Sequence, residues 1–228
     1  MEKLVYVLQC ADAGDGVALR EALVGGAADA IRKAGASEIS VNVHDEHVLQ
    51  GAGVAIHNRD PRVAAMVSFW MQNSDDRGPA EEALRSLVDG LDGYLVVESR
   101  PLLHSPPKGE RAPGANLVTC ITRKPGLDDE SFFSCWNEEH RKVAVETQST
   151  FAYVRNAVAR PLTPGAPAID GIVEESFPIE AITDPHVWYD CDDDAEYQRR
   201  LKRMIDSVTA FLDLSVIDSV PMSEYYLG

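Results

Sequence analysis

A histidine on an apolar helical stripe is the first group in this sequence that could carry out chemistry. Residues three, four and seven apart share one face of a helix. His140 shares such a face with four neighbours, Phe133, Trp136, Val143 and Thr147. Because apolar surroundings disfavour the charged form of an imidazole, this position suits a general base or acid near neutral pH. The alternative is a core histidine that is hydrogen-bonded to a backbone carbonyl.

The predicted strand 151–158 carries three further catalytic candidates. Successive side chains of a strand point to opposite faces, so Tyr153 and Arg155 share one face and Asn156 lies on the other. We expect the face of Tyr153 to point into a barrel lumen and that of Asn156 towards the helices. Tyr153 could donate a proton to a developing oxyanion, or it could be an amphipathic wall residue. Arg155 could hold a phenolate or carboxylate, and Arg155 or Asn156 could orient the substrate.

Aromatic and imidazole side chains elsewhere are candidates for lining a substrate pocket. They are Tyr6, His44, Trp70, Trp136, His186, Trp188 and Tyr189. The last three lie in a loop before the final helix, where they could form a lid or a stacking wall for a flat substrate. They could also be a hydrophobic anchor for the acidic segment 190–194.

Metal and nucleotide sites are not indicated. His44 and His47 flank two acidic residues, and imidazole and carboxylate groups are common metal ligands. In an extended strand the two histidines would point to opposite faces, so chelation would need a turn, and we expect no metal. The sequence has no phosphate-binding loop, dinucleotide-binding glycine motif or nucleophile elbow. Its four cysteines are dispersed, without a C-x-x-C pair.

The elements that must position these residues occur twice. A Pro- and Gly-rich stretch, 101–114, separates two halves with the same predicted order, β-α-β-β-α-β. The first half has predicted strands 4–10, 37–43, 63–71 and 94–97, with helices at 17–34 and from Pro79. The second half has predicted strands 117–122, 151–158, 172–177 and 216–220, with helices at 128–146 and from 192–194.

This order predicts an α+β fold made of two fused ferredoxin-like repeats. Each repeat would be an antiparallel four-stranded sheet with two helices on one face. Two such sheets bury their remaining apolar faces against each other and form one α/β barrel. We divide the chain into an N-terminal repeat (1–105), a linker (106–114) and a C-terminal repeat (115–228). The position that corresponds to His140 in the first repeat falls near Ala27, so we expect a single active site.

Composition limits the partners of this 228-residue chain. Hydrophobic residues make up 45% and charged residues 25%, as in ordinary globular proteins. The net charge of −16 argues against nucleic acid and membrane-surface partners and favours a neutral or apolar small molecule. No apolar run could span a bilayer, and no secretion signal is evident, so we expect a cytoplasmic protein. A homodimer through the tail 225–227 stays open, although a fused repeat does not need one to close a barrel.

Two neighbouring segments of the second half carry a family resemblance. They are Phe132-Phe-Ser-Cys-Trp-Asn-Glu-Glu-His140 and Phe151-Ala-Tyr-Val-Arg-Asn156. They resemble the EthD-like branch of the dimeric α/β-barrel superfamily, whose members carry an aromatic helix ending in Glu-His and then a Tyr-containing strand with a nearby Asn. The chain departs from the family at Ala157, where members have a histidine. The resemblance implies the barrel fold. For members that are enzymes it mostly implies cofactor-free lyases, cyclases or dehydratases that act on aromatic compounds.

The sequence therefore supports the hypothesis of a cofactor-independent lyase. It would remove water or another small fragment from an apolar aromatic substrate, in aromatic-compound metabolism, with His140 as general acid or base and Tyr153 polarising an oxygen. One alternative is a heme- or oxygen-dependent enzyme of the same superfamily, with His140 as the axial ligand. Another is a non-catalytic barrel that binds small molecules.

Overall fold

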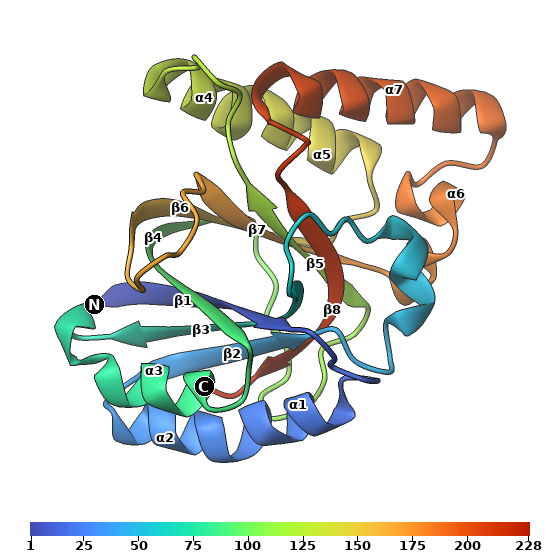
Figure 1. The fold of residues 1–228 in the computed structure, drawn as a ribbon. Helices are drawn as coiled ribbons and strands as arrows, with labels where there is room; N and C mark the ends of the chain where they lie inside the picture. The colour runs from blue at the N-terminus through green and yellow to red at the C-terminus, as the bar shows by residue number, and fades with distance from the viewer.

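Eight strands form one closed barrel in the computed structural model, which describes residues 1–228 (Figure 1). The strands are β1 (Glu2–Cys10), β2 (Ser37–Val43), β3 (Arg62–Met71), β4 (Gly90–Leu102), β5 (Ala115–Ile121), β6 (Ala152–Pro161), β7 (Gly171–Phe177) and β8 (Asp218–Tyr226). Around the barrel their order is β1-β3-β2-β8-β5-β7-β6-β4. All eight neighbouring pairs are antiparallel, so each strand has a partner on both sides.

The order of the strands confirms the predicted fold class. Within the first repeat the sheet runs β4-β1-β3-β2, and within the second it runs β8-β5-β7-β6. Both are the order of a ferredoxin-like sheet, so the repeats have equivalent topologies. Two seams join them into a ring: β2 pairs with β8, and β4 pairs with β6. The linker lies between β4 and β5, where the chain passes from one repeat to the other.

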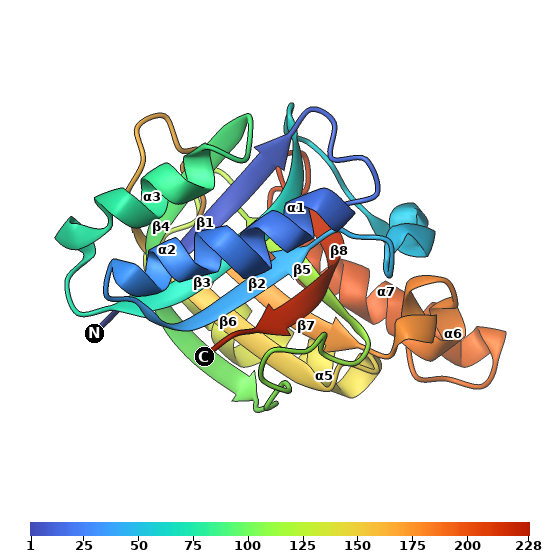
Figure 2. The same cartoon turned by 90° about the horizontal axis from the view of Figure 1, so that it is seen from below.

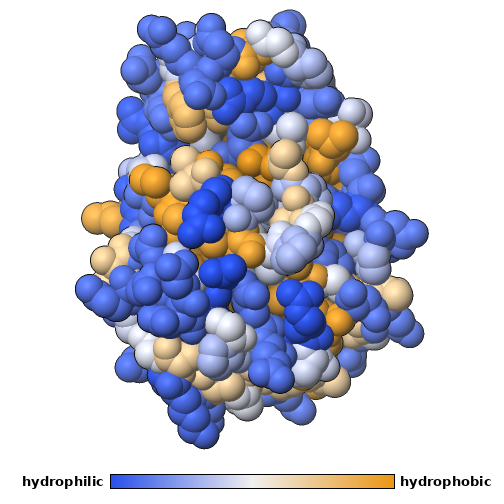
Figure 3. Space-filling view, turned by 60° about the vertical axis from the view of Figure 1, so that its left-hand side comes forward, coloured by the Kyte–Doolittle hydropathy of each residue, from blue (hydrophilic) through white to orange (hydrophobic).

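The helices cover opposite sides of the barrel. They are α1 (Val17–Ala22), α2 (Ala28–Lys33), α3 (Gly78–Arg85), α4 (Asp129–Ser134), α5 (Arg141–Thr147), α6 (Pro185–Trp188) and α7 (Asp194–Phe211). Figures 1 and 2 show α1, α2 and α3 across the first sheet, and Figure 1 shows α4, α5 and α7 on the opposite side. None of these helices has both the length and the apolar character that crossing a membrane would require. On the face shown in Figure 3, hydrophilic residues predominate and hydrophobic ones gather in a band across the middle.

Two of the predicted helices contain a wider turn. A π-helical segment, Leu23–Ala27, joins α1 to α2, and it includes Gly25 and Gly26. A second π-helical segment, Cys135–His140, joins α4 to α5. Single π turns within α-helices are frequent at functional sites. The predicted start of the second helix is confirmed, because the Asp128 carboxylate caps it by accepting a hydrogen bond from Ser131 N at 2.7 Å.

The faces of the strands are the reverse of those predicted for β6. Tyr153 and Ala157 pack with Trp136 and Phe211 beneath the helices, whereas Asn156 is fully buried on the other face, inside the barrel. The barrel interior is largely filled, by the apolar group Val5, Val7, Val63, Met66, Tyr94, Val96, Val118, Cys120, Ile169, Ile172, Val220 and Met222. Side chains of eight strands are just large enough to fill such a barrel. The apolar middle of the barrel therefore has no room for the expected apolar substrate.

Candidate active site

A large apolar cavity lies between the second sheet and its helices. Its volume is about 760 Å³, and 18 of its 28 lining residues are hydrophobic. The floor comes from β5, β6, β7 and β8, and the walls come from the π-helical segment, α6 and α7. The turn Leu49–Val54 of the first repeat closes one side with Gln50, Gly53 and Val54. The corresponding space in the first repeat is filled by a core of 24 buried residues. The cavity is thus a feature of one repeat only.

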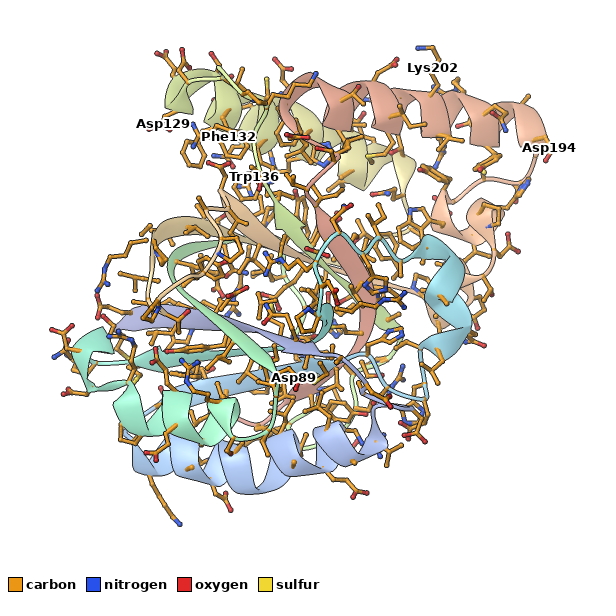
Figure 4. The ribbon with its side chains drawn as sticks, in the orientation of Figure 1. Asp89, Asp129, Phe132, Trp136, Asp194 and Lys202 are labelled. Atoms are coloured by element: carbon orange, nitrogen blue, oxygen red, sulfur yellow. The ribbon has the colours of Figure 1, made fainter.

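Trp136 forms one wall of this cavity. Its side chain is 1% exposed, and Figure 4 shows Phe132 and Trp136 pointing from their helix towards the sheet. The sheet accommodates the indole at Gly171, where an added Cβ would clash with the ring atom Cη2. Trp136 also packs against Phe132, with ring centroids 5.5 Å apart. Glycine and tryptophan together fix this side of the cavity.

His140 lies on the same π-helical segment and lines the cavity, as the stripe in the sequence suggested. Its Nδ1 is hydrogen-bonded to Ser207 Oγ at 3.0 Å, and its ring lies 5.3 Å from that of Phe211. Burial, helped by the positive charge of Arg155, lowers the pKa of His140 to about 4. The imidazole is therefore neutral at physiological pH, with one ring nitrogen held by α7.

Tyr153 lies in the floor, and it shares the cavity with His140. Its residue surface is 1% exposed. Burial is the main cause of a strong rise in the pKa of Tyr153, and the neighbouring Glu175 adds to it. The phenol therefore stays protonated and can act as a hydrogen-bond or proton donor. Arg155, two residues on, does not line the cavity, because its Nη1 donates to Asn137 Oδ1 at 2.6 Å and its Nε to Ser99 Oγ at 3.2 Å.

Glu175 is a candidate functional group that sequence reasoning missed. It lies on β7 directly opposite Tyr153 on β6, so the two side chains share one face of the sheet. Its residue surface is partly accessible through the cavity, but Oε1 is buried without a hydrogen-bond partner. Burial raises the pKa of Glu175 to about 7. A carboxyl that titrates near neutral pH can accept a proton and return it.

The signal for Glu175 was present in the strand Gly171-Ile-Val-Glu-Glu-Ser-Phe177. Adjacent residues of a strand face opposite sides. Glu174 and Glu175 therefore cannot both face solvent when apolar residues bound them on both faces. Glu174 points into the barrel and bonds to Asn156 Nδ2 at 2.9 Å, and Glu175 points into the cavity.

The loop before α7 contributes to the cavity as the sequence suggested, but only in part. Trp188 and Tyr189 line it, and the Trp188 ring stacks on Phe177 at 4.1 Å between centroids. Burial raises the pKa of Tyr189 to about 12. His186 is absent from the lining, and it bonds through Nε2 to Asp194 at 3.0 Å. These residues form the short helix α6, which the sequence analysis treated as loop.

Four other candidates lie away from this cavity. Tyr6 packs against α1–α3 and donates to Glu81 at 3.1 Å. His44 Nδ1 bonds to the Pro221 carbonyl at 2.8 Å. Trp70 lines a second, polar pocket at one end of the barrel. Asn156 accepts a hydrogen bond from Lys3 inside the barrel at 2.9 Å. None of the four can touch a substrate bound between the second sheet and its helices.

The acidic segment near His44 does gather ligand types. Ligand atoms of Asp45, Glu46 and His47 lie within 4.8 Å of one another. Arg20 pairs with both carboxylates there, at 3.3 Å from Asp45 and 2.5 Å from Glu46. Asp45 also accepts hydrogen bonds from Ser223 and Tyr225, each at 2.7 Å. The guanidinium thus supplies the positive charge that these carboxylates need.

The cavity fits a heme poorly. Heme propionates are commonly paired with cationic side chains, yet no Lys or Arg is among the lining residues. The residues present suit an uncharged organic molecule better than a dianionic cofactor.

Comparisons with known proteins agree with this geometry. The family model described as the EthD domain matches residues 124–215, which include α4, α5, β6, β7 and most of the cavity wall. No curated protein gives a significant match.

Two solved structures are similar over the whole chain. An anthrone oxidase-like protein has a TM-score of 0.57 at 8% identity, covering 100% of this chain and 93% of its own. A candidate monooxygenase from Lactobacillus acidophilus NCFM has a TM-score of 0.50 at 10% identity, covering 100% of this chain and 96% of its own. At such identities the likeness establishes the fold alone. The second repeat therefore matches the EthD domain, as the resemblance in the sequence predicted, and the whole chain has the fold of these two barrel structures.

Proposed function

We propose that this protein is an enzyme that removes a proton from a flat, apolar substrate held between the second sheet and its helices. The observation that carries the proposal is Glu175: a carboxyl without a hydrogen-bond partner, in an apolar cavity, whose burial raises its pKa to about 7. A base works best when its pKa lies near the working pH. Structural carboxyls are ordinarily paired or solvated, so this one is available for chemistry.

The lining supports a neutral aromatic substrate. The walls include Trp136, Trp188 and Tyr189, and the lining holds no Lys or Arg for a substrate anion. The cavity volume of about 760 Å³ falls within the range of small-molecule sites. Polar groups are few, namely Glu175, His140, Gln50, Gln148, Asp184 and several hydroxyls. A molecule with a large ring surface and one or two oxygens fits this distribution.

Three side chains divide the proposed proton transfers. The Glu175 carboxylate takes a proton from an acidic carbon of the substrate, and the electron pair moves into the ring system and its oxygen. Tyr153, directly opposite Glu175, donates a hydrogen bond to that developing oxyanion. Neutral His140, positioned by Ser207, contacts the substrate and accepts or donates one hydrogen bond. Arg155 is a positioning residue in this scheme, because its charge helps to keep His140 neutral.

The fate of the resulting carbanion defines the reaction class. In an oxygenation, one O₂ adds to the carbanion and a CH₂ group becomes a carbonyl with loss of one water; the names of the two similar structures, oxidase-like and monooxygenase, support this route. In an elimination, the carbanion expels a neighbouring hydroxyl as water, with Tyr153 as the proton donor. The adjacent base and donor support this lyase route. Neither route requires an organic cofactor.

The test uses anthrone, which has an acidic methylene group. In D₂O under nitrogen, the protein should accelerate exchange of the methylene protons over buffer, as followed by NMR, and Glu175→Gln should abolish the acceleration. Exposed Glu180→Gln is the matched control and should behave as the parent protein.

Under air, oxygen uptake with anthraquinone formation identifies oxygenation. Loss of water from hydroxylated analogues, with and without oxygen, identifies elimination. Binding without any proton exchange would refute the proposal in favour of a non-catalytic barrel.

A further inference from the structure

A second pocket at one end of the barrel has a chemistry that the proposed reaction does not use. Its volume is about 310 Å³, and only five of its 18 lining residues are hydrophobic. It lies on the inner face of the barrel, where Lys3, Glu98, Glu174 and Glu224 come from four different strands. Residues 104–106, from the Pro- and Gly-rich stretch, also line it. It is thus separated by the sheet from the cavity of Glu175.

The pocket already binds one ammonium group, that of Lys3. Lys3 is 5% exposed, and its Nζ lies 2.5 Å from Glu98, 3.6 Å from Glu174 and 2.9 Å from Asn156 Oδ1. Arg100 pairs with the other oxygen of Glu98 at 2.6 Å. This end of the barrel therefore stabilises a nitrogen cation by surrounding it with oxygen acceptors.

Acceptors in the same pocket are left without a cation. Glu224 receives only a long hydrogen bond, 3.4 Å from Ser40 Oγ. Asn116 is 4% exposed, and it has a buried Oδ1 with no partner. Burial, together with the charge of Glu174, raises the pKa of Glu224 to about 7. Four carboxylates line the pocket against two cations, Lys3 and Arg100. Buried acceptors of this kind are normally satisfied by a donor.

We propose that this end of the barrel is a binding site for a small organic ammonium ion, with Glu224 and Asn116 as its acceptors. An ammonium group has three N–H donors and no acceptor, which matches two free oxygens and the excess of negative charge. Trp70, half-buried at the same pocket, offers an aromatic surface to the carbon chain or to the cation. The site does not rest on the proposed reaction, because it shares no residue with the cavity of Glu175.

The probe for this site is 1,4-diaminobutane, with butane-1,4-diol as its uncharged match. In calorimetric titrations at about 0.15 M salt, which screens exposed charges, the diamine should bind one per chain and the diol should not bind. Glu224→Gln should weaken diamine binding at least about tenfold, because it removes the charge at a buried contact. Exposed Asp192→Asn removes the same charge from the acidic run and should leave binding unchanged, as should Glu175→Gln.

An NMR readout keeps the proposal testable if Glu224→Gln does not fold. In the parent protein, the diamine should shift the indole N–H signal of Trp70 and leave that of Trp188 in place. Equal binding of diol and diamine, an effect of Asp192→Asn as large as that of Glu224→Gln, movement of Trp188 instead of Trp70, or no binding of the diamine would each overturn the assignment.

Discussion

Replacing Glu175 by Gln should raise the stability of the protein while it removes the proposed base. A carboxyl whose pKa is raised in the folded state binds protons more tightly there than in the unfolded chain. Its contribution to stability is therefore fully present below the unfolded pKa and is lost as pH rises through the folded pKa. The pKa of Glu175 is raised from 4.5 to about 7, and each unit corresponds to about 1.4 kcal/mol. At pH 8 the ionisation of Glu175 therefore lowers the free energy of unfolding by up to about 3 kcal/mol. At pH 5 it lowers this free energy by less than about 1 kcal/mol.

Urea unfolding at the two pH values measures this difference. Glu175→Gln should be more stable than the parent protein at pH 8 by up to about 3 kcal/mol, and the gain should shrink towards zero at pH 5. Glu174→Gln is the matched control from the adjacent position. Because Glu174 accepts from Asn156 and lies 3.6 Å from Lys3, its replacement should destabilise the protein at pH 8. If the gain in stability of Glu175→Gln over the parent protein were smaller at pH 8 than at pH 5, Glu175 would not be an unpartnered carboxyl with a raised pKa.

Three further changes probe the same cavity. His140→Asn should remove a pH dependence of stability: a pKa lowered from 6.5 to about 4 makes the parent lose up to about 3 kcal/mol as pH falls from about 6.5 to 4, and the unfolding midpoints of the variant should fall less steeply over that range. Tyr153→Phe should lower turnover of an active substrate about 10²-fold while thermal unfolding stays near that of the parent, since one oxyanion donor is removed; an unchanged rate would exclude Tyr153 from the chemistry. Gly171→Ala should destabilise the protein by about 1–3 kcal/mol by pushing Trp136 from its place, which thermal unfolding and indole fluorescence would report.

The fold could be predicted from the sequence because apolar residues recur at regular intervals along the elements and because the order of elements occurs twice. Alternation identified β2 as 37–43, and the two-fold order of elements predicted the ferredoxin-like repeats. The same pattern could not predict which face of β6 points into the barrel. Ala152 and Val154 on one face are as apolar as Tyr153 and Ala157 on the other, so the pattern has no preferred direction. The error reversed the expected places of Tyr153 and Asn156.

The residues of the candidate site could be predicted only where they lie together on one helix or strand. His140 and Trp136 lie on one helical stripe, and both line the cavity. Glu175 joins them through strand pairing and through the space left between sheet and helices, neither of which is visible in one linear segment. The placement of the cavity followed a physical limit that sequence reasoning overlooked, since an eight-stranded barrel is filled by its own side chains.

The two seams of the ring differ in length, and this difference determines where the barrel opens. The register of β4 with β6 extends over seven residue pairs, whereas that of β2 with β8 extends over four, Ser40 to Val43. Local fluctuations begin where the fewest backbone bonds must break. The β2–β8 seam should therefore open more readily than the β4–β6 seam. Amide protons along it should exchange with solvent sooner than those of the opposite seam. Glu224 lies on the β2–β8 seam, paired in register with Asn42, so transient parting there would give small molecules a route into the barrel.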